Sequence, residues 1–110
     1  MTALSEARHT AEFIISEGNG HYSRESGTAG GALAAGEVVK ITANKLVSYN
    51  GSGTVVGIAI NAAAADGDKV AYIARSAEVN GNMLSSTEQT SGELASGATT
   101  GLATLKIIVR

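Results

Sequence analysis

The chain has 110 residues, which suits one compact domain and leaves no room for two. Its formal net charge of −2 is spread along the sequence, and without a basic cluster to neutralise phosphates we expect no nucleic-acid partner. The absence of cysteine excludes disulfides and thiolate metal sites, and the longest apolar runs are far too short to span a membrane.

The core is expected to be thin. Much of the 44% hydrophobic content is alanine, and the chain has one Phe, three Tyr and no Trp. Aromatic side chains usually supply much of the apolar bulk of a core, and a domain of this size buries only about two-thirds of its unfolded surface. We therefore expect burial against other subunits.

Residues 1–32 are predicted to form an extended N-terminal arm. The first twelve or so residues are polar and lack periodicity. Phe13 to Ser16 is a short apolar run with β-branched residues, long enough for one extended segment. From Glu17 to Ala32 the chain is rich in Gly, Ser, Thr and Asn, with Tyr22 as its one large apolar side chain.

Two interpretations of Phe13, Ile14 and Ile15 are open. They are either the first strand of the body, or a tethered segment that adds as a strand to a partner's sheet edge. We favour the second, because sixteen mostly polar residues separate them from the next apolar stretch. The candidate partner-binding residues are therefore Phe13, Ile14, Ile15, Ser16 and Tyr22.

The body, residues 33–110, is predicted to be mainly β. Asn50-Gly51-Ser52-Gly53 is the strongest turn signal, since Asn-Gly tolerates the positive φ that tight hairpins need. Shorter turns are expected at Ala43-Asn44, Asp66-Gly67-Asp68 and Asn80-Gly81-Asn82. The expected strands are Glu37 to Thr42, Lys45 to Tyr49, Thr54 to Asn61, Lys69 to Arg75 and Ile107 to Val109.

One short helix is the remaining expected element. Ser85-x-x-Glu88 has the form of a capping box. The stretch from Glu93 to Leu105 then has apolar residues at spacings of four, four and three, namely Leu94, Ala98, Leu102 and Leu105. Gly97 and Gly101 oppose a helix there, because each costs about 1 kcal/mol relative to alanine.

No motif predicts catalysis, a metal site or a cofactor. His9 and His21 are the only histidines, and a structural metal site usually needs three or four fixed ligands. The glycine-rich stretches lack the lysine and serine or threonine ending of a phosphate loop. The serines have no histidine in the predicted body to act as their base. We therefore expect no enzyme activity.

Four blocks of sequence stand out for their order and spacing. They are Phe13 to Glu25, Lys45 to Gly51 with the following Val55 to Ile58 and Ala62 to Asp66, Ala74 to Gly81, and Ile107 to Arg110. In this order they resemble the head decoration proteins of tailed bacteriophages, the family typified by the phage lambda decoration protein. The resemblance runs from about residue 13 to the C-terminus.

This resemblance implies a small β-clip-like domain that assembles as a homotrimer. It also implies binding to the major capsid protein on the outer surface of the head, through the N-terminal arm, with a cementing rather than an enzymatic role. The expected location is the virion, and the host cytoplasm during assembly. Two alternatives are an oligomeric β-rich assembly or adaptor subunit of another particle, and a small enzyme with a site shared between subunits.

Overall fold

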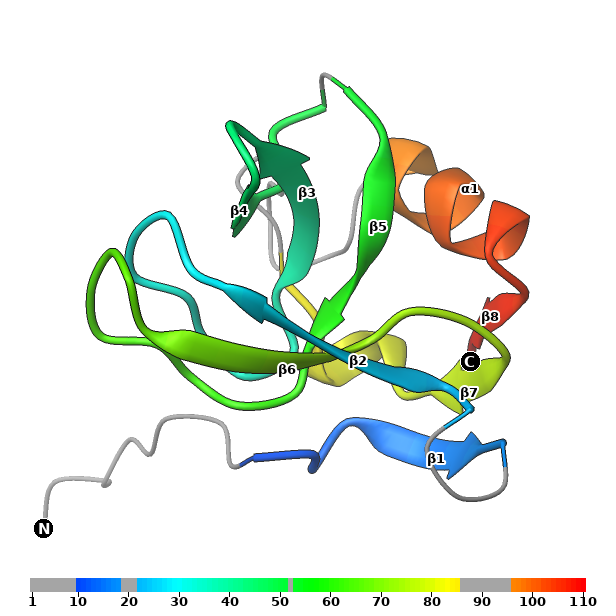
Figure 1. The fold of residues 1–110 in the computed structure, drawn as a ribbon. Coiled ribbons are helices and arrows are strands. Elements are labelled where there is room, and N and C mark those ends of the chain that lie inside the picture. Colours follow the sequence, from blue (N-terminus) through cyan, green and yellow to red (C-terminus); the bar gives the residue numbers. More distant parts are fainter. Residues whose placement is uncertain (1–9, 19–21, 52, 86–95) are drawn as a thin grey trace, which may run out of the picture.

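A computed structural model describes residues 10–18, 22–51, 53–85 and 96–110 of the chain. These residues form two β-sheets and one short α-helix (Figure 1), as the sequence predicts. The predicted capping box and Leu94 fall wholly or partly outside the described residues, as do both histidines and residues 1–9 of the arm.

The larger sheet has five strands in the order β2-β6-β5-β3-β4, and every neighbouring pair is antiparallel. Beyond the end of β2, Ala29 bridges to Leu46 of β4, and the Gly30 N–H donates to the Leu46 carbonyl at 2.8 Å. The sheet therefore curls toward closure as a small barrel. Its strands are β2 (Arg24–Thr28), β3 (Val38–Thr42), β4 (Lys45–Ser48), β5 (Val55–Ala59) and β6 (Lys69–Ile73).

The two faces of this sheet bury different clusters. Paired positions Ala59 and Tyr72 belong to one cluster, which is rich in small side chains. The row Val38, Ile58 and Ile73 belongs to the other. Four of the nine buried residues of the first cluster are alanines, which suits the small interior volume of a tightly curled sheet. Its buried members are Ala29, Leu33, Val39, Leu46, Ala59, Ala63, Val70, Tyr72 and Ala74.

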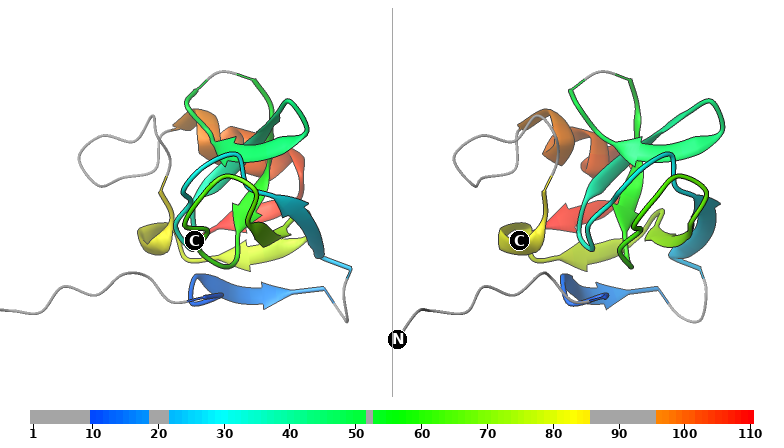
Figure 2. Two further views of the ribbon diagram at one scale, coloured as in Figure 1. Left: turned by 60° about the vertical axis from the view of Figure 1, so that its left-hand side comes forward. Right: turned by 90° about the vertical axis from the view of Figure 1, so that its left-hand side faces the viewer.

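The smaller sheet and the helix both pack on the face of the larger sheet that carries Val38, Ile58 and Ile73. The strand order of the smaller sheet is β1-β7-β8, with β1 antiparallel and β8 parallel to β7. Figure 2 shows β1 along one side of the molecule, next to β7. The elements are β1 (Ile14–Glu17), β7 (Ala77–Val79), a 3-10 turn (Gly81–Met83), α1 (Ser96–Thr104) and β8 (Ile107–Val109).

The predicted helix is confirmed over Ser96–Thr104, and its apolar stripe faces the core. Ala98 and Leu102 are fully buried, and Leu105 packs against the same cluster. Gly101 has a packing role in this helix. A Cβ at that position would lie 2.7 Å from Cγ2 of Val55 on β5. Glycine has a low helix propensity, but at this position it allows α1 to approach the sheet closely.

Gly101→Ala should therefore lower the free energy of unfolding, by up to about 2 kcal/mol. Overpacking a tight contact typically costs about 1–3 kcal/mol, which outweighs the gain of about 1 kcal/mol in helix propensity. Urea denaturation measures the change. In a Val55→Ala background the same substitution should cost less, because the contact with Cγ2 is removed, although Cβ of residue 55 still lies 2.8 Å from the added Cβ. A stabilising effect in the otherwise unchanged chain would contradict this packing.

Two connections test the predicted turns. Ala43 and Asn44 both have positive φ, 52° and 66°, and join the paired strands β3 and β4, as predicted. At the predicted turn Asn50-Gly51-Ser52-Gly53, Gly51 and Gly53 have positive φ, 89° and 87°, but the connection is not a hairpin. The strands on either side, β4 and β5, both pair with β3 and not with each other. A turn signal fixes local backbone geometry, whereas the partner of a strand depends on long-range packing.

The stretch from Glu17 to Ala32, which we expected to separate Phe13 to Ile15 from the body, contains strand β2 of the larger sheet. Each of the five residues of β2 pairs with one of β6. The strand was invisible to hydrophobic periodicity, since none of its side chains is fully buried and none is large and apolar. Main-chain pairing alone places it in the sheet.

Candidate functional site

The structure separates the five candidate partner-binding residues into a buried and an exposed group. Phe13 is 1% exposed and belongs to the main core, and Ile14 packs against that core. Ile15 is 54% and Tyr22 61% exposed, and Ser16 is also exposed. The favoured interpretation of Phe13 to Ile15 as a segment tethered apart from the body is therefore corrected. In the described structure they belong to the body.

The chain holds β1 in place at both ends. At the start, Phe13 fills the core, and its carbonyl accepts a hydrogen bond from the Asn80 N–H at 2.8 Å. At the end, the Arg24 guanidinium donates to both carboxylate oxygens of Glu17, at 2.8–3.0 Å. This hydrogen bond raises the pKa of Arg24 above its usual value. The segment is thus clamped to the fold by one apolar and one ionic contact.

Ser23 was missed by the sequence analysis, although it fixes the connection from β1 to β2. It is the one fully buried polar side chain among the described residues. Its hydroxyl accepts from the Gly18 N–H and donates to the Ser76 carbonyl, each at 2.8 Å. Buried polar groups of this kind are stabilising only when paired. No sequence signal distinguishes Ser23 from the many exposed serines.

Tyr22 is exposed but its position is defined. The guanidinium of Arg75 lies 5.7 Å from the centre of its ring, within the range of a cation–π contact. Arg75 also bonds the Tyr22 carbonyl and pairs with Glu25. A preordered exposed aromatic side chain loses little conformational entropy on binding, and such residues often anchor interfaces.

The outward face of the smaller sheet carries one row of polar and apolar side chains. Ser16, Glu78 and Ile108 occupy matching positions on β1, β7 and β8. Ile15 sits beside this row, at a bulge between Ile14 and Ser16. Ile108 is 50% exposed, so two isoleucines from opposite edges of one small sheet remain accessible. Exposed apolar side chains gathered on one face are typical of an interaction surface.

Glu78 is the charged centre of this row. Arg110 donates a hydrogen bond to its carboxylate at 2.7 Å, and Ser16 donates a longer one at 3.4 Å. The hydrogen bond from Arg110, with its positive charge, lowers the pKa of Glu78 below the usual value of 4.5. The pair links the last residue of the sequence to the middle strand of the sheet.

Replacing Glu78 by Gln should make stability less sensitive to acid. Because the folded pKa of Glu78 is lowered, its stabilising contribution is present above about pH 4.5 and is lost as the pH falls below that value. The drop in Tm between pH 7 and pH 3 should thus be smaller in the variant. Arg110→Gln should reduce the drop in the same way, and an unchanged drop in both variants would exclude the pair as its source.

Other site chemistries find no support in the described part of the chain. No group of three or more His, Cys, Asp and Glu side chains is placed to hold a metal ion there. Asp66-Gly67-Asp68 forms the predicted turn, in which the Asp68 carboxylate accepts from the N–H groups of Ala64 and Ala65. Within the same residues no helix is long and apolar enough to cross a membrane.

Comparison with known proteins decides the family. The family model described as bacteriophage lambda head decoration protein D matches residues 3–107, nearly the whole chain. The chain belongs to this family. A search of the curated proteins finds no match. Membership in the lambda head decoration protein D family confirms the resemblance in the sequence blocks.

The head decoration family indicates a structural role in the capsid of a bacteriophage and is not a known enzyme family. It implies binding to a phage capsid and a location on the virion. For a head decoration protein, the accessible row on the smaller sheet and the ordered Tyr22 are the natural candidates for contact with the particle.

Proposed function

We propose that this protein is a capsid decoration, or cementing, protein that binds the outer surface of a tailed-phage head as a homotrimer and stabilises it. The observation that carries the proposal is the family match over residues 3–107. The partner is the major capsid protein, and the trimer forms in the host cytoplasm before it binds to the head. The domain is of the β-clip-like kind.

Two features support assembly into a trimer. Four of the nine buried residues inside the larger sheet are alanines, so the monomer buries only modest apolar bulk there. A large apolar side chain also remains exposed away from the proposed capsid-binding residues, namely Ile41 at 51% on β3. Closed rings of three subunits require two different patches on each subunit.

The proposed capsid-binding surface keeps the sequence-based candidates and gives them different roles. Ile15, Ser16 and Tyr22 are exposed and would touch the capsid protein. Phe13 and Ile14 would instead hold this surface on the body, since both pack in or against the core.

We also keep the division into a capsid-binding part, residues 1–32, and a decoration domain, residues 33–110, as a proposal. The first part contains β1 and β2, which pair with β7 and β6 of the second. The proposed division is therefore one of function, with the capsid-binding part docked on the domain that carries it.

The test is the binding of purified protein to expanded heads that lack it. Light scattering should give three times the chain mass of 11.0 kDa at micromolar concentration. Cosedimentation should show saturable binding, and electron microscopy should place density at three-fold and quasi-three-fold positions. A monomeric mass would reject the trimer, and no binding to such heads would reject the decoration role.

A further inference from the structure

The edge strand β8 leaves part of its main chain unpaired by the sheet. In its parallel pairing with β7, alternate residues make the hydrogen bonds. The Lys106 carbonyl accepts from Ala77, and Arg110 both donates to Val79 and accepts from Gly81. By the same alternation, the N–H and C=O groups of Ile107 and Val109 point away from β7. No described residue hydrogen-bonds to these groups, so within the described part of the chain they form the free edge of the smaller sheet.

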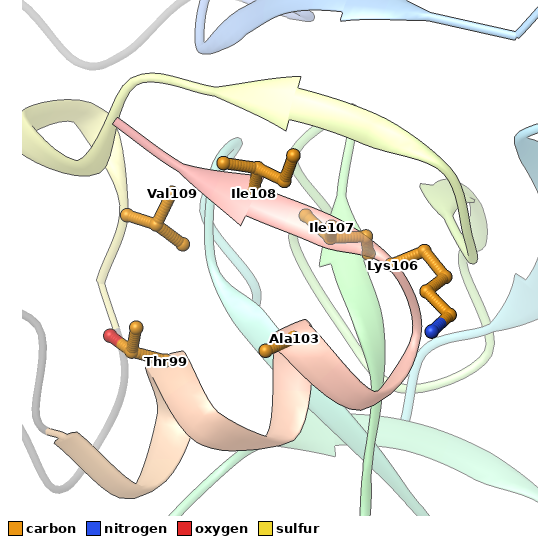
Figure 3. Close-up of a pocket in the computed structure, with 6 residues that line it drawn as sticks. All are labelled: Thr99, Ala103, Lys106, Ile107, Ile108 and Val109. Atoms are coloured by element: carbon orange, nitrogen blue, oxygen red, sulfur yellow. The ribbon is translucent and has the colours of Figure 1, made fainter.

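This free edge borders a groove between β8 and α1 (Figure 3). Small side chains of the helix, Thr99 and Ala103, form the opposite wall, and both are exposed. The hollow has a volume of about 290 Å³ and is mostly apolar. That volume lies just below the range of roughly 300–1,000 Å³ typical of ligand pockets, so it suits a few residues of extended chain. Its lining residues are Thr99, Ala103, Lys106, Ile107, Ile108 and Val109.

The charge at the groove is positive. Lys106 lines it, and among the described residues no acidic side chain forms an ion pair with Lys106. Among the residues that the structure describes, no acidic residue lines the groove. A binding partner with apolar side chains and an adjacent carboxylate would match both the apolar lining of the groove and the positive charge of Lys106.

A second copy of the chain fits this groove poorly. Pairing β8 with β8 of another copy is a self-complementary contact, which generates a two-fold dimer and not a trimer. The other open edge of the same sheet, β1, is interrupted by the bulge between Ile14 and Ser16, and bulges protect edges from pairing. In the larger sheet, β4 is already bridged to Ala29.

We propose that this groove binds an extended segment of the major capsid protein, which adds as a strand to the free edge of β8. An apolar side chain of that segment packs against Thr99 and Ala103, and a carboxylate pairs with Lys106. The groove lies next to Ile108, in the same small sheet as Ile15, so one face engages the capsid at two adjoining places. The inference rests on the proposed decoration function.

Val109→Pro tests the strand addition directly. Proline removes one of the two N–H groups of β8 that point away from β7 and places its ring on the free edge, and it is tolerated where an edge strand faces outward. The trimer mass and Tm should stay close to those of Val109→Ala, which removes the side chain and keeps the N–H. Affinity for expanded heads lacking the protein should fall at least tenfold for Val109→Pro relative to Val109→Ala. Equal affinities would overturn the proposal.

A second pair of variants leaves β8 untouched. Ala103→Phe fills the groove from the helix, whereas Thr100→Phe adds the same ring at an exposed site of α1 that does not line the groove. Only Ala103→Phe should weaken binding to the heads, again by at least tenfold. If Ala103→Phe instead dissociates the trimer, the groove is an interface between copies and the capsid assignment is wrong.

Binding of the unmodified protein to expanded heads distinguishes a failure of this inference from a failure of the proposed function. If it binds expanded heads and both groove variants bind equally well, strand addition is rejected while decoration stands. If the unmodified protein fails to bind such heads, the decoration function itself is rejected. Raising the salt concentration should lower the affinity of the unmodified protein for the heads more than that of Lys106→Gln, because the variant lacks the charge that pairs with the capsid segment.

Discussion

Replacing Phe13 by alanine should lower the free energy of unfolding by about 3–5 kcal/mol, the largest stability effect that we expect from a single substitution in this chain. Phe13 is the single phenylalanine of the sequence and is 1% exposed in the main core. Truncation removes its buried apolar surface and leaves a cavity that the surrounding β-sheets cannot fully close. A domain of this size has only about 5–15 kcal/mol of total stability.

Ile15→Ala is the matched control, because the side chain of Ile15 is more than half exposed. It should change stability by no more than about 0.5 kcal/mol. Urea denaturation of both variants compares a buried and an exposed apolar residue only two positions apart. If Phe13→Ala proved as mild as Ile15→Ala, the segment would be a free arm in solution, and β1 would not belong to the body.

Ile15→Asp should weaken binding to expanded heads by at least about 100-fold. Burying an isoleucine contributes about 1.5–3 kcal/mol, and every 1.4 kcal/mol is a factor of ten in affinity. An aspartate also places an unpaired charge in the contact, which adds a desolvation cost. Since a trimer presents the residue three times, the loss at each site is compounded through avidity. Cosedimentation with heads that lack the protein measures the affinity.

Ile41→Asp provides the control for introducing a charge. Ile41 is 51% exposed, close to the exposure of Ile15, but it lies on β3 of the larger sheet. Where light scattering shows that the Ile41→Asp variant is still a trimer, its affinity for heads should stay within about threefold if the smaller sheet is the capsid-facing side. Full binding by Ile15→Asp, with the trimer intact, would remove Ile15 from the capsid contact.

The sequence was informative where local chemistry dominates. Positive φ at Ala43 and Asn44 gives the tight turn between β3 and β4, and the spacing of Ala98, Leu102 and Leu105 gives α1. Both features depend on a few adjacent residues and their side-chain directions. The family resemblance likewise rested on short blocks, and the match over residues 3–107 confirms it.

Sequence reasoning failed where a residue's role depends on partners far away in the chain. Phe13 lies in the core because β1 pairs with β7, which is more than sixty residues later in the chain. β2 forms by main-chain pairing with β6 although its side chains carry no apolar pattern. Gly101 looked like a defect in a helix, and its reason is the approach of Val55 from β5.

By itself, the sequence determined that this is a mainly β protein with one short helix, no cysteine chemistry and the signature of a head decoration family, because composition and local patterns suffice for those conclusions. The tertiary structure alone decided which apolar residues of the first segment are buried and which remain exposed for a partner. It also revealed the free edge of β8 beside α1. Burial and edge exposure are properties of the assembled β-sheets, and Phe13 and Ile15 look alike until strand pairing separates them.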